Sequence, residues 1–585
     1  MVINVPCNGH CLAVTTYRNF GSHSLTPGPH GEAISRSPTH SVLERYELMQ
    51  NKPSLSVSAG KKMPIARSSK NAPRFSRHLR FASMAAVVLL TATALIVAKS
   101  SDQLVPRFQA FSDPEGQFAN FNPGGPTDTN NNAFFQDLGT NGRRCVTCHQ
   151  AGDAWSVTPP HIQIRFNATR GNDPIFRPVD GANCPTADVS TLEQRREAYS
   201  LLLTKGLIRV GIAVPANADY QVNGVYNRYG CNATDVISMY RRPLPTTNLP
   251  FLSAVMFDGR ESSPTTGTTK ILYSNYPTSL LSDLAHQSVD ATIIHAQGDG
   301  TRPTPEEQQQ IVDFETKIFT AQIRDHHAGD LDEGGANGGP APLATQPFFI
   351  TINSSVHFLV PAFEQPGGLV NSGDGQFSSN IFNLYGKWLQ GKEDEHHEHY
   401  EHSAARRSVA RGEQLFNTLE IPISGVAGIN DDVAAGGLVA GGVPSLQGTC
   451  GTCHDTPNVG NHSFPTPLNI GTGDPSPTNP SVNLGGLDMT YLPEITVCKK
   501  DAATGQPTSN CRTTTDLGQA LIDGRFDHVG KIKGPILRGL AGRAPYFHNG
   551  SAATLMDAVN FYDTRFTLHL SQQDKDDLVA FLKTL

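Results

Sequence analysis

Charged side chains are scarce in this sequence, and no basic cluster stands out. The chain has 46 Lys and Arg against 53 Asp and Glu, so charged residues make up 17 % of its 585 residues and the formal net charge is −7. Without a basic stripe, the sequence gives no indication of nucleic-acid binding, and without an internal repeat of short period it is not a repeat protein. The low charge, together with 54 Gly and 41 Pro, favours a compact, loop-rich globular protein over a disordered one. The length suffices for two or three domains, each with its own core.

The N-terminal region predicts export. Residues 1–70 are polar, and a basic stretch at 74–80 precedes an apolar run of 18 residues at 81–98. A basic flank, an apolar run and small residues at its end are typical of an export signal, here cleaved after Ala94 or Ala98. An uncleaved membrane anchor is the alternative, because the run is long enough to span a bilayer. We therefore predict a periplasmic protein.

Export bears on the cysteines, of which the chain has ten. Two lie in the N-terminal region and four belong to motifs described below, which leaves Cys184, Cys231, Cys498 and Cys511. In an oxidising periplasm such thiols tend to pair. Two of them fall in each half of the chain, so the simplest pairing is Cys184–Cys231 and Cys498–Cys511, although sequence alone does not fix the connectivity.

Each half of the chain also contains one Cys-x-x-Cys-His motif. Two thiols at this spacing can add to the two vinyl groups of one haem, and the adjacent His can ligate its iron. Zinc and thioredoxin-type redox chemistry are the alternatives for a lone Cys-x-x-Cys, but the following His, the repetition and the export signal favour haem c. We therefore predict two covalently bound haems, held by Cys145, Cys148 and His149 in the first half and by Cys450, Cys453 and His454 in the second.

Segments beside these motifs have the apolar spacing of helices. They cover residues 131–138, 408–416 and 572–585. Because small cytochrome c domains are built from such helices, the predicted fold class is mainly α, with two cytochrome c-like haem domains, long loops and an insertion.

The predicted domain boundaries follow the motifs. Residues 1–104 form an extension plus signal peptide or anchor, 105–345 a first haem domain, 346–404 an insertion or linker, and 405–585 a second haem domain.

Several segments resemble the bacterial di-haem cytochrome c peroxidase and MauG superfamily. The match is specific in the second half and looser in the first. The segments are 533–538 (Lys-Gly-Pro-Ile-Leu-Arg), 544–555 (Ala-Pro-Tyr-Phe-His-Asn-Gly-Ser-Ala-Ala-Thr-Leu), 557–562 (Asp-Ala-Val-Asn-Phe-Tyr), 256–260 (Met-Phe-Asp-Gly-Arg) and 304–315. The resemblance implies that the haem of His149 is the reactive one, with an open or weakly occupied distal face. It implies that the haem of His454 is six-coordinate and passes electrons.

The resemblance also implies a sixth ligand for the second haem. In the peroxidase branch of the family, a Met lies 14 residues after the His that corresponds to His548, whereas this chain has Tyr562, and MauG-type members use a Tyr. We therefore predict Tyr562 as the ligand, a hard anionic donor that lowers the haem potential relative to a thioether. Alternatively, Tyr562 is a core aromatic of a helix, and Met489 or Met556 is the ligand.

Three positions depart from the peroxidase pattern. The family's Trp between the haems corresponds to Phe257, which is far harder to oxidise, so stepwise hole transfer through it is not expected. The distal Gln is displaced by an insertion, and its best match is Gln287. The family's acid/base Glu corresponds to Gln297, which cannot take a proton from peroxide. His295 is predicted to serve as the base instead, and a satisfied core or surface His is the alternative.

Further binding groups follow from the resemblance. Arg260 and Arg538 suit the haem propionates, because a guanidinium pairs well with a carboxylate. A Ca²⁺ site between the haems is also implied, with the Pro545 carbonyl as one donor.

The leading functional hypothesis is a periplasmic di-haem oxidoreductase. It would act on peroxide or O₂ at the first haem, with a small redox protein as electron donor or acceptor. The alternatives are a non-catalytic electron-transfer cytochrome, favoured by the loss of the family Trp and Glu, and a di-haem dioxygenase similar to the rubber oxygenases.

Overall fold

A computed structural model describes residues 103–262, 279–348, 380–390, 397–426, 428–430, 445–463, 467–475 and 487–585. In these ranges, no helix is both long and apolar enough to cross a membrane. The predicted signal peptide or anchor at 81–98 lies outside them.

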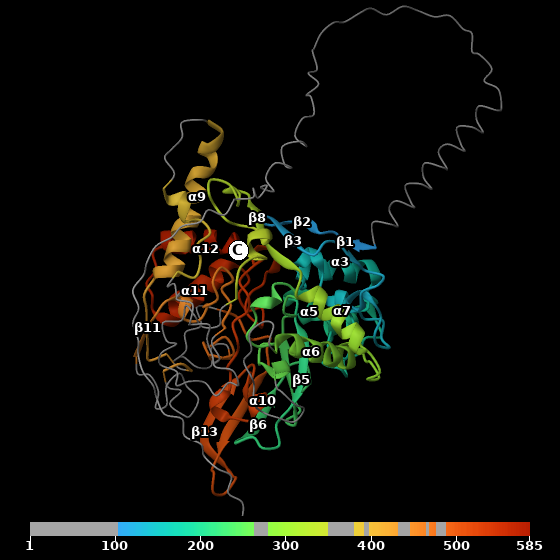
Figure 1. Cartoon of the computed structure of the whole chain (residues 1–585). Helices are drawn as coiled ribbons and strands as arrows, with labels where there is room; N and C mark the ends of the chain where they lie inside the picture. The colour runs from blue at the N-terminus through green and yellow to red at the C-terminus, as the bar shows by residue number, and fades with distance from the viewer. Residues whose placement is uncertain are drawn as a thin grey trace, which may run out of the picture. The chain divides into compact units, whose positions relative to one another are not determined.

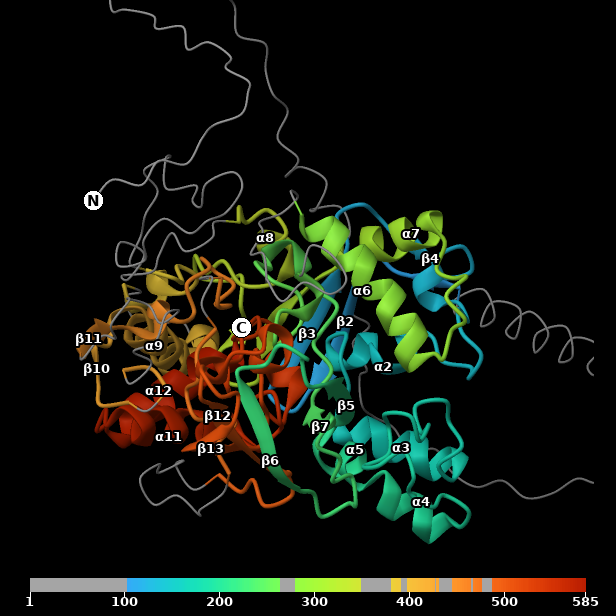
Figure 2. The same cartoon turned by 90° about the horizontal axis from the view of Figure 1, so that it is seen from below.

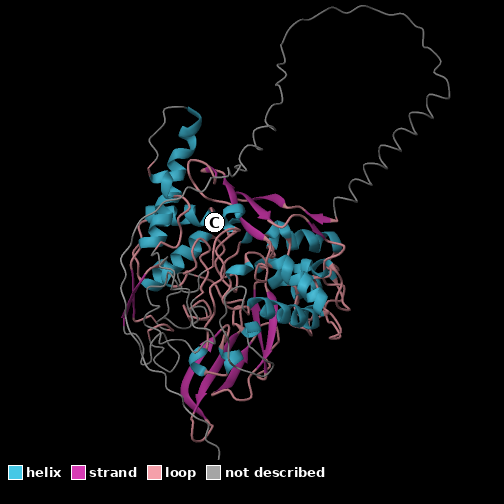
Figure 3. Cartoon of the chain, in the orientation of Figure 1, coloured by secondary structure: helices cyan, strands magenta, loops and turns pink. Residues whose placement is uncertain are grey.

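The fold is mixed α/β rather than mainly α, so that prediction was wrong (Figure 3). Helix accounts for 33 % and strand for 19 % of the structure. The sequence argument considered only the segments beside the haem motifs. The strands lie elsewhere, in stretches such as β2 (Phe108–Asp113), where exposed and partly buried residues alternate with the period of two that a strand requires.

The described strands form five small antiparallel sheets. In sheet order they are β2 with β3 (Gly116–Phe121), β8 (Phe319–Asp325) and β9 (Gly329–Asp330); β13 (Pro507–Thr514), β12 (Glu494–Lys500) and β6 (Tyr220–Tyr226); β5 (Ile208–Ala213) and β7 (Val236–Arg241); β10 (Ile421–Ser424) and β11 (Ser445–Gly448); and β1 (Leu104–Val105) and β4 (Thr127–Asp128).

One of these sheets joins the two halves of the chain. Strand β6 from the first half pairs with β12 from the second, with Val225 opposite Ile495, and Figure 2 shows the two strands side by side. Beneath the sheet, a buried apolar cluster takes Ile237 and Met239 from the first half and Ile495 and Val497 from the second. The two halves of the chain therefore share one sheet and one apolar cluster.

Both predicted disulfides are confirmed. Cys498 of β12 lies directly opposite Cys511 of β13 and bonds to it. Cys184 bonds to Cys231 in the first half.

The described α-helices are α2 (Cys145–Cys148), α3 (Pro159–Thr169), α4 (Leu192–Ala198), α5 (Ser200–Lys205), α6 (Leu280–His295), α7 (Pro305–Glu315), α8 (Pro340–Leu343), α9 (His397–Thr418), α10 (Ala520–Asp523), α11 (Leu555–Phe566) and α12 (Gln572–Lys583). Short 3₁₀ turns are η3 (Ala133–Phe135), η4 (Ala151–Asp153), η5 (Leu249–Phe251), η6 (Arg260–Ser262), η9 (Gly386–Leu389), η10 (Cys450–Thr452), η11 (Phe526–His528) and η12 (Ala541–Arg543).

The predicted helices at 408–416 and 572–585 are confirmed as parts of α9 and α12, whereas 131–138 forms only the single turn η3. Helices α9, α11 and α12 lie together (Figure 1). Gly412 permits the close approach of α9 to α12, because a Cβ there would lie 1.9 Å from the carbonyl oxygen of Asp577. The Asp577 carboxylate also accepts hydrogen bonds from Ser408 and Arg411 of α9.

Candidate haem sites

The first Cys-x-x-Cys-His motif folds into a single helical turn, α2. Its start is capped locally, because the backbone N–H of Arg144 donates to the hydroxyl of Thr147 at 2.9 Å. The backbone N–H of His149 donates to the carbonyl of Cys145 at 3.1 Å, which closes the turn. The two thiols are thereby held one turn apart, with the His directly after the second.

The second motif repeats this geometry in η10. The backbone N–H of Thr449 donates to the hydroxyl of Thr452 at 2.9 Å, and that of His454 donates to the carbonyl of Cys450 at 2.9 Å. A Thr before the second Cys thus caps both turns. The four thiols of the two motifs are free, whereas the other four cysteines in the described part of the chain form disulfides.

The two motif histidines are oriented in the manner of metal ligands. His149 Nδ1 lies 3.1 Å from the carbonyl oxygen of Trp155, and His454 Nδ1 lies 2.7 Å from that of Gly460. Ligating histidines commonly donate one ring N–H to such a carbonyl, which leaves the other nitrogen for the metal. Burial lowers the pKa of each His to about 4, so both imidazoles are neutral near pH 7, the form that binds iron.

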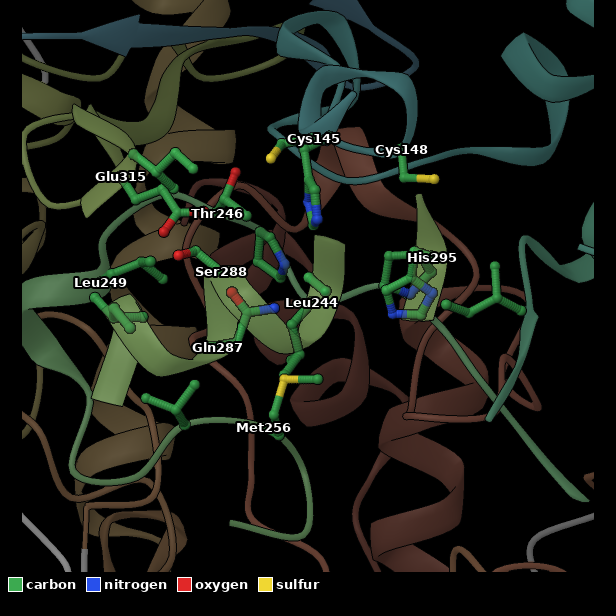
Figure 4. Close-up of a pocket in the computed structure, with 18 of the residues that line it drawn as sticks. Cys145, Cys148, Leu244, Thr246, Leu249, Met256, Gln287, Ser288, His295 and Glu315 are labelled. Carbon is green, nitrogen blue, oxygen red and sulfur yellow. The ribbon is translucent and has the colours of Figure 1, made fainter. Parts of the chain in front are cut away.

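A cavity opens beside each motif. The first has a volume of about 1530 Å³, including its open mouth, and Figure 4 shows Cys145 and Cys148 on one wall with Gln287 and His295 of α6 on another. The second has a volume of about 1560 Å³ and is lined by Cys450, His454 and mainly apolar side chains. Both cavities are open at a mouth and are lined mainly by apolar side chains, as a site for a large flat cofactor requires.

Thiol pairs at the required spacing, neutral histidines held through Nδ1 and large apolar cavities together fit haem c. An aromatic ring also lies near each histidine. The Phe134 ring lies 6.2 Å from that of His149, and the Phe416 ring lies 6.0 Å from that of His454.

Tyr562 lines the second cavity together with both thiols and His454. Burial, reinforced by the nearby thiols of Cys453 and Cys450, raises the pKa of its phenol. The alternative ligands Met489 and Met556 are not among the residues lining this cavity. Of the three predicted candidates, the structure brings only Tyr562 to the cavity of His454.

The predicted catalytic residues are divided between the cavity and the surface. Gln287 and His295 lie two helical turns apart on α6 and both line the first cavity. Gln297 follows the helix, is exposed, and accepts a hydrogen bond at 3.2 Å from Asn141 instead of facing the cavity.

The sequence did not reveal the partner of His295, which is the buried carboxylate of Asp180. His295 Nδ1 lies 2.5 Å from one oxygen of Asp180, and Arg143 pairs with the other. Although burial opposes ionisation, the hydrogen bond and charge of His295, together with the charge of Arg143, lower the pKa of Asp180. All three side chains line the first cavity, so the imidazole is held there by an ionised carboxylate.

Glu315, the last residue of α7, is a second acid of the first cavity. It is 3 % exposed, its Oε2 has no hydrogen-bond partner in the structure described, and burial raises its pKa to about 8. Its carboxyl is therefore mainly protonated at neutral pH and can donate a hydrogen bond into the cavity, toward which Figure 4 shows it pointing.

The raised pKa of Glu315 predicts a pH-dependent stability. Between its ordinary value near 4.5 and about 8, the folded chain binds a proton that the unfolded chain releases, so stability falls as pH rises. We expect Glu315→Gln to remove a dependence of about 1.4 kcal/mol per pH unit in this window. Urea unfolding of both proteins at pH 5, 6, 7 and 8 measures the pH dependence of the free energy of unfolding. The same pH dependence in the variant and the original protein would contradict the raised pKa of Glu315.

The wall between the two cavities contains Phe257, Lys533 and Pro535, each of which lines both. The Phe257 ring lies 6.0 Å from that of His548, which lines the second cavity. Phe257, which the resemblance aligns with the family's Trp, thus lies in the wall between the two motif cavities.

The two predicted propionate partners differ in position. Arg260 lines the first cavity and pairs with Asp258 at 3.0 Å. Arg538 is 1 % exposed but is not among the residues lining either cavity, and burial lowers its pKa to about 10. The Ca²⁺ site stays a prediction.

Comparison with known proteins supports the resemblance seen in the motifs. A protein named cytochrome-c peroxidase IdrP2, from Denitromonas iodatirespirans, is 35 % identical over 146 residues, which is 24 % of this chain and 36 % of that protein. A second, cytochrome-c peroxidase IdrP1 from Pseudomonas sp. (strain SCT), is 38 % identical over 81 residues, 12 % of this chain and 21 % of that protein. No family model matches the chain.

These similarities confirm the predicted resemblance to the cytochrome c peroxidase family. They support a haem-dependent, peroxidase-like oxidoreductase. The matched segments span about a third and about a fifth of the relatives' own lengths, so the activity of the whole protein is treated below as a proposal.

Proposed function

We propose that this protein is an exported di-haem c-type oxidoreductase that reduces peroxide in the first cavity with electrons received from a small redox protein. The single observation that carries the proposal is the asymmetry of the two cavities. The first has hydrogen-bonding groups of α6 along its wall, whereas the second has a Tyr within a mainly apolar lining.

The chain's residues divide into those that hold the cofactors and those that handle protons. Cys145 and Cys148 would attach one haem and Cys450 and Cys453 the other, with His149 and His454 as iron ligands. When bound, the haems supply the iron and the electrons with which one peroxide, two electrons and two protons give two waters.

Two groups of the first cavity suit the proton transfers. The imidazole of His295 can take a proton from incoming peroxide at Nε2, because Asp180 occupies its Nδ1 and stabilises the resulting cation. The amide of Gln287 can orient the peroxide by hydrogen bonds. The protonated carboxyl of Glu315 can supply a proton to the departing oxygen, and its pKa of about 8 suits that role near neutral pH.

The second cavity suits electron transfer. Tyr562 is the proposed sixth ligand of its haem, which would leave no open position there. Phe257 separates the cavities with an apolar ring, so electrons would cross by tunnelling rather than by oxidation of this side chain.

Turnover of peroxide by the purified two-haem protein tests the function. We expect consumption of H₂O₂ with a reduced cytochrome or dye as donor, and expect His295→Leu to lower kcat/KM for peroxide about 10²-fold. His161→Leu is the matched control, because His161 also pairs with an Asp (Asp153, at 2.6 Å) but is not among the residues lining the cavity.

An absence of turnover in the unmodified protein would reject the peroxidase proposal. Equal losses in both variants would reject the specific role of His295.

A second candidate is a di-haem electron carrier without catalysis. Phe257 in place of the family's Trp and the exposed position of Gln297 favour it. The two candidates differ in the reduced protein, because a carrier with two six-coordinate haems would not bind CO.

A further inference from the structure

Lys533 is a buried cation in the wall between the two cavities. It is 2 % exposed and lines both of them. Its neighbours fix its position: the backbone N–H of Lys533 donates to the carbonyl of Phe257 at 2.9 Å, and its Nζ donates to the carbonyl of Ala254 at 2.6 Å. These two hydrogen bonds join segment 533–538, which resembles the peroxidase family, to the segment that holds Phe257.

The ammonium lacks an anionic partner in the part of the chain that the structure describes, where its contact is with a backbone carbonyl. The buried cation Arg241 nearby shows the usual arrangement, because it pairs with both Asp258 and Asp516. A buried charge without such compensation is strongly destabilising. Burial accordingly lowers the pKa of Lys533 to about 7. The site therefore suits a negative group that the described part of the chain does not provide.

The chemistry of the proposed cofactors identifies that group. Each haem carries two propionates, on the side of the porphyrin away from the vinyl groups that the cysteines consume. Among the described residues that line the second cavity, Lys533 is the only Lys or Arg, and it is also one of the cations of the first. A propionate of a haem in either cavity would therefore meet the same ammonium group, that of Lys533.

We infer that Lys533 pairs with a propionate of each haem and thereby sets the reduction potentials of both. This inference rests on the proposed presence of a haem in each cavity. The Lys is a positioning and electrostatic residue rather than a catalytic one. Its positive charge favours the reduced form of each iron, because reduction removes one positive charge from each site.

Spectroelectrochemical titration of the two-haem protein tests the inference without reference to turnover. We expect Lys533→Met to lower both reduction potentials, so that the equilibrium constant for reduction of each haem falls about tenfold. We expect Lys533→Arg to keep both potentials near their original values. Lys500→Met is the matched control. Lys500 Nζ also donates to a backbone carbonyl, that of Ala218 at 2.9 Å, but lines neither cavity, so both potentials should stay unchanged.

The outcomes separate clearly. A shift in one potential alone would overturn the sharing of Lys533 between two haems, and unchanged potentials would overturn the inference entirely. If Lys533→Met does not retain both haems, Lys533→Gln makes the same comparison with a polar side chain of lower charge. If the unmodified protein does not turn over peroxide but Lys533→Met still lowers both potentials, the proposed function is rejected and the role of Lys533 stands.

Discussion

Replacing Cys450 and Cys453 together by Ala is expected to reduce the number of covalently bound haems from two to one while CO binding by the reduced protein persists. Replacing Cys145 and Cys148 together is expected to leave one covalent haem and abolish CO binding. The reason is the difference between the cavities: Gln287 and His295 face the first, whereas Tyr562 occupies the second beside its two thiols. An iron whose sixth position is taken by a phenolate does not readily exchange it for CO.

Intact mass spectrometry of each variant counts the covalent haems, and the visible spectrum of the reduced protein with and without CO reports the open position. Replacing Cys498 and Cys511 together by Ala is the matched control, since it removes two cysteines of the same half that form a disulfide between β12 and β13. That variant should keep both haems. CO binding by the protein that holds only the second haem would contradict the assignment of Tyr562.

The features that could be predicted from the sequence are those that depend on residues close together along the chain. Each haem motif is a five-residue turn closed by its own backbone and a Thr, so its geometry depends on few distant residues. The disulfide partners followed from where the four cysteines outside the haem motifs fall along the chain. The helices α7 and α12 have capping boxes at their first turns, which are local as well.

The features that the sequence did not reveal depend on contacts between distant segments. Asp180 and His295 are 115 positions apart, and no periodicity links them. The pairing of β6 with β12 joins strands from opposite halves of the chain. The mixed α/β class was missed for the same reason, because short strands are stabilised by their neighbours and carry a weak signal of their own. Segment 533–538 could be recognised in the sequence as similar to the peroxidase family. The position of Lys533 between two cavities could not be predicted from it.

A buried ion-pair network close to the wall between the cavities shows how far the fold depends on such distant contacts. The guanidinium of Arg241 donates to both oxygens of Asp516, at 2.7 and 2.8 Å, and to Asp258 at 2.5 Å. All three side chains are at most 3 % exposed. Asp516 follows β13 in the second half, so this Arg holds the two halves together by charge. Against the penalty of burial, the charges of Arg260 and Arg241 lower the pKa of Asp258 to about 2.

Replacing Arg241 by Met is therefore expected to destabilise the protein by about 3–5 kcal/mol at pH 7, because it leaves Asp516 buried without its cation and weakens the compensation of Asp258. The loss should shrink as pH falls from 7 toward 4, because burial raises the pKa of a carboxyl that has lost its cation, so the variant takes up a proton there. In the original protein Arg241 holds the pKa of Asp516 below its ordinary value, and that of Asp258 is about 2, so both stay ionised at pH 4. Urea unfolding at pH 7 and pH 4 measures both effects.

The matched control is Arg144→Met, which removes an equally bidentate Arg–Asp pair from the surface. Arg144 and Asp137 are joined at 2.9 and 3.0 Å, but their side chains are 48 % and 49 % exposed, so solvent already stabilises both charges. Its loss should cost less than about 1 kcal/mol. Similar losses in the two variants would mean that the Arg241 network contributes no more than a surface pair, and the two halves of the chain would then be held together by the β6–β12 pairing and its apolar cluster instead.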